Sequence, residues 1–188
     1  MFDKNEDKQR TSKWLNKLEA HSKGWIDGDS ENKRIKTADF VNHSQKIAIE
    51  LKREKGENLD NKNHNALVLS NRIEAYIKDA NKKFGNYIDF QTLLIIELRS
   101  STWSAQVIMS GIKQLHLING QHVGNSIKNE RLFSKMENIG AIVFWPAQGN
   151  ITNIAYYFDN LNAKDVCKMT QLETEKVLGN PLELLELI

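Results

Sequence analysis

The chain has 188 residues, a formal net charge of +2 and 40% hydrophobic residues. These values are typical of one ordinary soluble globular domain, and so small a net charge is no evidence for a nucleic-acid partner. No apolar run is long enough to span a membrane and the first thirty residues are polar, so we expect a cytoplasmic protein with neither signal peptide nor anchor. The single cysteine, Cys167, excludes an internal disulfide.

In the first half of the chain the residues predict a helix, a short strand, a hairpin and a second helix. Residues 1–10 are highly charged and are expected to fray, and a helix is expected over about 11–22. A short strand falls within 24–32, and a hairpin spans about 34–53. Apolar residues at helical spacing predict the second helix over about 67–84, ended by Gly85.

The second half begins with a strand, Thr92–Leu98, that is apolar enough to be buried on both faces. Further elements are expected in this order: a helix over about 103–117, a short helix over 131–137, and two strands over 140–145 and 151–158 joined by a turn. We therefore expect one α/β domain over residues 1–188, with its core at about 11–160. The segment 161–188 is a C-terminal extension, in which 182–188 could form a docking helix or a dimer contact.

The hairpin carries the most informative residues. From Lys46 to Lys52 apolar and other residues alternate strictly, so Glu50 and Lys52 share one strand face. If Asn42 to Gln45 form the turn, the symmetric even-length loop places Phe40 opposite Ile47 and Asp39 opposite Ala48. Asp39 then points to the same side as Glu50 and Lys52, whereas an odd-length loop would turn Asp39 to the apolar side.

An acid pair beside a lysine suggests metal-assisted chemistry. Two neighbouring carboxylates repel each other and are tolerated most easily with a divalent cation between them. Magnesium suits such a site, since it binds one or two carboxylates and completes its shell with water and phosphate oxygens. The metal makes its bound water more acidic, and a lysine can position that water or stabilise charge on phosphate. The product would be phosphodiester hydrolysis.

The pattern of Asp39, ten intervening residues and Glu50-x-Lys52 resembles the active-site signature of the PD-(D/E)XK nuclease superfamily, with Ala38 in place of the proline. The resemblance implies a restriction-endonuclease-like core: a central mixed β-sheet flanked by helices, in the order helix, three-stranded meander, helix, strand, then an added helix and hairpin. It assigns Asp39 and Glu50 as metal ligands and Lys52 as the catalytic lysine. Glu19, on the first helix, is the candidate for a further metal ligand.

The function implied by the resemblance is a Mg²⁺-dependent nuclease acting on DNA, in which Mn²⁺ can substitute. RNA stays open as a substrate, and symmetric cleavage of both strands would require a homodimer. The alternative is a catalytically inactive module of the same fold that binds nucleic acid or protein. In a third interpretation the protein is an unrelated α/β domain whose hairpin is merely amphipathic, and Asp39 and Glu50 then lie apart.

Glu97 is an unusual acid within an apolar strand. A buried carboxylate is unfavourable unless it is paired or binds metal, so we expect an ion pair at the strand's end, near Arg99. Ile96-Glu97-Leu98-Arg99 also echoes Ile49-Glu50-Leu51-Lys52. We favour the earlier strand as the site, because lysine can act as a base and arginine cannot.

Overall fold

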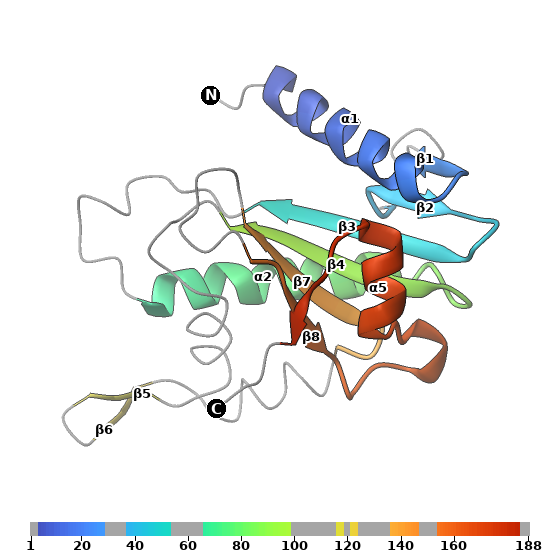
Figure 1. Cartoon of the computed structure of the whole chain (residues 1–188). Helices are drawn as coiled ribbons and strands as arrows, with labels where there is room; N and C mark the ends of the chain where they lie inside the picture. The colour runs from blue at the N-terminus through green and yellow to red at the C-terminus, as the bar shows by residue number, and fades with distance from the viewer. Residues whose placement is uncertain are drawn as a thin grey trace.

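The computed structural model describes residues 4–28, 37–53, 66–98, 116–118, 121–123, 136–146 and 154–184. These residues form an α/β fold with a mixed seven-stranded sheet, in the order β1-β2-β3-β4-β7-β8-β9, and helices on both faces (Figure 1). No helix within the described ranges combines the length and the apolar character needed to cross a membrane.

The first half follows the predicted order of elements. Helix α1 (Lys4–His21) leads into an antiparallel meander of β1 (Trp25–Asp27), β2 (Phe40–Asn42) and β3 (Ile47–Arg53). Helix α2 (Ala66–Phe84) then connects β3 to β4 (Gln91–Leu98), which lies parallel to β3. The order helix, three-stranded meander, helix, strand is therefore observed.

The second half extends the sheet on the other side of β4. Strand β7 (Ala141–Pro146) is parallel to β4, β8 (Tyr156–Asp159) is antiparallel to β7, and β9 (Glu183–Leu184) is parallel to β8. Between β8 and β9 lie a 3-10 turn, η2 (Asp165–Cys167), and helix α5 (Gln171–Leu178). A separate two-stranded ladder pairs β5 (His116–Ile118) with β6 (Gln121–Val123).

Two apolar layers cover the two faces of the sheet. Alternate residues of β4 divide between them: Leu93 and Ile95 pack in the layer that contains α1 and α5, and Leu94 and Ile96 pack in the layer that contains α2. The predicted burial of this strand on both faces is confirmed, as expected for a central parallel strand between helices. Each polar side chain of the sheet can thus be assigned to the α1 face or the α2 face.

Several predicted boundaries differ from the structure; the strand predicted over 151–158, for example, begins only at Tyr156. The first helix begins at Lys4, within the segment expected to fray, where Glu6 forms an ion pair with Arg53 at 3.0 Å. The helix predicted up to about 117 is contradicted at 116–118, which form β5, and the helix suggested for the C-terminal tail is contradicted at 183–184, which form β9. The rest of these two segments, 103–115 and 185–188, lies outside the described residues, as does most of the short helix predicted over 131–137.

Candidate active site

The register of the hairpin decides which side chains can meet. Phe40 pairs with Ile49, and Asn42 pairs with Ile47, so the turn consists of residues 43–46 and the predicted register is wrong by two residues. The Asn42 side chain explains the shift, because its Oδ1 accepts hydrogen bonds from the Ser44 hydroxyl at 2.7 Å and the Gln45 N–H at 3.1 Å. A shift of two residues keeps every side chain on its predicted face.

Asp39, Glu50 and Lys52 are brought together on the α2 face of the sheet. Asp39 directly precedes β2, and its Oδ2 accepts a hydrogen bond from the backbone N–H of Leu51 at 2.8 Å. On β3, the Lys52 ammonium lies 2.7 Å from Glu50 Oε1. The third interpretation expected the two carboxylates to lie apart, and the structure contradicts that expectation, since Lys83 Nζ lies within 4.0 Å of both.

Helix α2 adds two charged residues that the sequence analysis did not identify. Lys83 Nζ lies 2.6 Å from Glu50 Oε1 and 4.0 Å from Asp39 Oδ1. Asp79 Oδ2 lies 2.6 Å from Lys52 Nζ. Their spacing of four residues places them on one side of the helix, next to its buried apolar stripe, and this was a usable signal. The site is thus a five-residue ionic cluster between β2, β3 and α2.

Glu50 is the most deeply buried member of the cluster. Its side chain is 1% exposed, against 28% for Asp39 and 16% for Lys83. Both ammonium groups bind the same oxygen, Oε1, whereas Oε2 is buried and has no hydrogen-bond partner in the described part of the chain. Buried carboxylate oxygens are nearly always satisfied, so Oε2 is an acceptor without a donor.

The cluster perturbs the ionisation of its members. Burial, followed by repulsion from Glu50, raises the pKa of Asp39 to about 6, although Lys83 and the Leu51 N–H oppose the increase. For Lys52, burial alone would lower the pKa, but Glu50 and Asp79 together raise it above its ordinary value. Lys52 therefore stays protonated at neutral pH. Asp39, with a pKa of about 6, loses its proton just below neutral pH.

Glu19 does not join this group, and the structure contradicts its proposed place at the site. Its Oε1 accepts hydrogen bonds from the backbone N–H groups of Gly24 at 2.9 Å and Trp25 at 2.6 Å. Trp25 and the apolar residues of α1 pack on the α1 face of the sheet, opposite Asp39 and Glu50. The physical role of Glu19 is to fasten the turn between α1 and β1.

The remaining acid pair is suited to a divalent metal. The described residues contain no group of three or more His, Cys, Asp and Glu placed to hold a metal ion, but Asp39 and Glu50 form a close pair of carboxylates in the cluster. Magnesium requires only one or two protein carboxylates, because water and substrate phosphate complete its shell. The unpartnered Glu50 Oε2 is an oxygen that a cation would satisfy. The donor set therefore fits Mg²⁺ at Asp39 and Glu50.

Glu97 belongs to a different feature on the opposite face. It accepts a hydrogen bond from Trp14 Nε1 at 2.7 Å and from Arg53 Nε at 3.2 Å, and Arg10 lies 3.8 Å away. The predicted pairing is observed, but with these partners; Arg99 lies outside the described residues. Since Glu97 faces α1 and Glu50 faces α2, the resemblance between their strands does not make one site.

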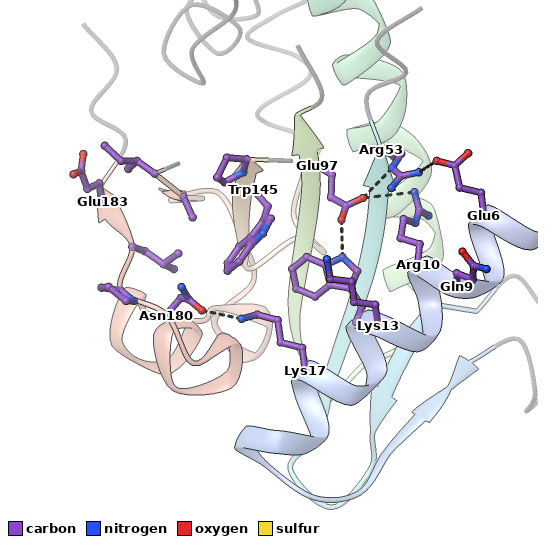
Figure 2. A pocket seen from close by; sticks show the side chains of 16 residues that line it. Glu6, Gln9, Arg10, Lys13, Lys17, Arg53, Glu97, Trp145, Asn180 and Glu183 are labelled. Carbon is purple, nitrogen blue, oxygen red and sulfur yellow. Dashed lines mark hydrogen bonds and ion pairs between the residues drawn. The ribbon is translucent and has the colours of Figure 1, made fainter. Parts of the chain in front are cut away.

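The Glu97 network lines a cavity of about 900 Å³ between α1 and the C-terminal segment (Figure 2). Across it, Lys17 reaches from α1 to Asn180 Oδ1 at 2.8 Å and lies 4.8 Å from the centre of the Trp145 ring. Trp14 meets Trp145 edge to face, with ring centres 5.2 Å apart. These contacts join α1 to the sheet and to the C-terminal segment, so we assign them a structural role.

Comparison of the chain with protein-family models, curated proteins and solved structures found no match. The functional argument therefore depends on the site itself. Its distinguishing features are a close carboxylate pair, a fully buried glutamate with one unsatisfied oxygen, and two lysines bound to the other oxygen.

Proposed function

We propose that the protein is a magnesium-dependent nuclease that hydrolyses phosphodiester bonds of DNA, built on a restriction-endonuclease-like core. The observation that carries the proposal is the convergence of Asp39, Glu50 and Lys52 on one face of the sheet. The order of elements, with a three-stranded meander between two helices and a following parallel strand, supports it. Together, the two observations support the proposal more strongly than either does alone.

Each residue of the cluster has a distinct role in this proposal. Asp39 and Glu50 would hold the metal, which when bound would supply an acidified water and neutralise charge on the phosphate. Lys52 stays an ammonium because Glu50 and Asp79 raise its pKa. Its suited role is therefore to position the nucleophile and stabilise negative charge on the phosphate, rather than to take a proton. Asp79 keeps the Lys52 ammonium in place.

A second candidate is the non-catalytic module that binds nucleic acid or protein. One observation favours it: Glu50 Oε1 is occupied by two lysines, and Lys52 is also paired with Asp79. A cluster neutralised in this way can persist as a buried ionic network without any metal. The two candidates differ in whether divalent metal binds and whether the phosphodiester bond breaks.

The test is cleavage of linear and supercoiled DNA, and of RNA, in Mg²⁺, in Mn²⁺ and in EDTA. Lys52→Gln is the test variant, because it removes the charge and keeps an N–H donor for Glu50. Lys46→Gln is the matched control, since Lys46 is on the same hairpin but 59% exposed and paired with Asp89. We expect metal-dependent DNA cleavage that Lys52→Gln abolishes and Lys46→Gln retains.

Three other outcomes would change the conclusion. Intact DNA and RNA under both metals would refute the nuclease and favour the binding module. Cleavage of RNA alone would keep the mechanism and replace the substrate. Cleavage that survives in Lys52→Gln would come from another site or a contaminating nuclease.

A further inference from the structure

Lys83 occupies the position between the two carboxylates where a metal would be needed. We propose that Lys83 is an exchangeable counter-ion: its ammonium partly balances the negative charge of Asp39 and Glu50 in the metal-free protein and turns away when a divalent cation binds. The inference rests on the metal site of the proposed function. It adds a control on metal entry that is built into α2.

The distances single out Lys83. Its Nζ lies 2.6 Å from Glu50 Oε1 and 4.0 Å from Asp39 Oδ1, and among the described residues no other cation lies within 4.0 Å of both carboxylates. A divalent cation bound to Asp39 and Glu50 would lie next to the Lys83 ammonium even if it used the unpartnered Oε2 of Glu50, because Lys83 contacts both carboxylates. Ammonium and metal would also repel each other strongly in this partly desolvated position. The two cations are therefore expected to compete for the two carboxylates.

The second lysine of the cluster is held differently. Lys52 contacts Glu50 at 2.7 Å and also Asp79 at 2.6 Å. When a metal takes Asp39 and Glu50, Lys52 keeps one carboxylate partner, whereas Lys83 loses both of the carboxylates it contacts. Lys52 is thus expected to stay in place while Lys83 leaves.

The position of Lys83 permits its departure. It is the penultimate residue of α2, and its side chain is 16% exposed, close to the 17% of Lys52, so its position at the end of the helix and its single close carboxylate contact distinguish it. A lysine side chain is long and flexible, and it can keep its apolar stem packed while the charged end turns to solvent. No rearrangement of the sheet is required for the exchange.

The inference is tested by Mn²⁺ binding, measured as the loss of the electron paramagnetic resonance signal of free Mn²⁺, without any substrate. Lys83→Gln removes the competing charge but keeps an N–H donor for Glu50. We expect it to bind Mn²⁺ roughly tenfold or more tightly than the parent, because one cation no longer opposes the other. Lys83→Arg should stay close to the parent. The matched control is Lys78→Gln, on the same helix but 62% exposed and paired with Glu74, and it should change nothing.

The outcomes separate this inference from the proposed function. Mn²⁺ binding by the parent with no change in Lys83→Gln would overturn the counter-ion role and leave the metal site standing. No binding by any variant would overturn both. If Mn²⁺ affinity rose more in Lys52→Gln than in Lys83→Gln, the inference would be overturned, because Lys52 would then be the lysine that opposes the metal.

A measurement on the unaltered protein gives an independent test, should Lys83→Gln fail to fold. The side-chain NMR signals of the lysines can be followed as Mg²⁺ is added. We expect the Lys83 signals to move toward those of solvent-exposed lysines while the Lys52 signals stay near their metal-free positions. Saturation with Mg²⁺ that leaves the Lys83 signals unmoved would refute the exchange.

Discussion

Replacement of Asp39 by asparagine is expected to stabilise the metal-free protein above neutral pH. Asparagine has the same shape and can accept the Leu51 N–H hydrogen bond, which the Asp39 carboxylate accepts at 2.8 Å. It carries no charge next to Glu50. The substitution therefore removes the unfavourable feature of Asp39 and keeps its favourable contact.

The size of the effect follows from the ionisation of Asp39. Burial and Glu50 raise its pKa from 3.8 to about 6, so the folded protein binds this proton more tightly than the unfolded chain. The stabilisation from the proton is complete below pH 4 and is lost as the pH rises through 6. A change from 3.8 to about 6 corresponds to at most about 3 kcal/mol at pH 8. The attraction to Lys83 is already included in this value, and the 28% exposure of Asp39 weakens the effect through solvent screening, so we expect a gain of about 1 to 3 kcal/mol.

The assay is urea unfolding in EDTA, followed by tryptophan fluorescence at pH 4 and pH 8. The gain of Asp39→Asn should be clear at pH 8 and nearly absent at pH 4. Asp89→Asn is the control, because the exposed Asp89 has its pKa lowered by Lys46 and should gain nothing at either pH. Loss of stability in Asp39→Asn at pH 8, or an equal gain at both values of pH, would refute the reasoning.

Three other substitutions probe the scaffold by the same unfolding assay. Glu97→Gln should lose about 2 to 4 kcal/mol, because it leaves Arg53 and Arg10 without their buried carboxylate; no loss would show that the network is incidental. Thr170→Ala removes the capping box of α5 and should lose about 1 kcal/mol, whereas Thr170→Ser should not. Gly140→Ala would press its methyl group against the Cys167 carbonyl and should lose more than about 2 kcal/mol; a neutral result would contradict this close packing.

The sequence was sufficient to predict which residues share the site on β2 and β3. Strand alternation fixes the face of Glu50 and Lys52, and any even-length loop adds Asp39 to it. The register was predicted two residues away from that observed because the Asn42 side chain moves the turn to 43–46, with Lys46 in the left-handed region at φ 55°. The predicted and observed turns have the same length, so loop length alone does not distinguish the two registers.

The contribution of α2 could not be predicted from the hairpin alone. Lys83 and Asp79 reach Glu50 and Lys52 only because the helix crosses back over β3, a tertiary relation that no local pattern gives. Glu19 was misplaced for the same reason. It lies at the end of the apolar stripe of α1, and that helix packs on the opposite face of the sheet.

Two elements that were not predicted, α5 and the β5–β6 ladder, have signals in the sequence. Thr170-Gln-Leu-Glu173 followed by Gly179 is a capping pattern that marks α5. Asn119-Gly120, between the two strands of the small ladder, is typical of a hairpin turn.

The most direct test of the metal site is anomalous diffraction from crystals of the protein soaked or grown in Mn²⁺. The account predicts an anomalous peak bound by oxygens of Asp39 and Glu50, with Lys83 turned away from Glu50 and Lys52 still paired with Asp79. Saturating Mn²⁺ without a peak at these carboxylates, and with both lysines still on Glu50, would contradict it and leave the cluster as a structural ionic network.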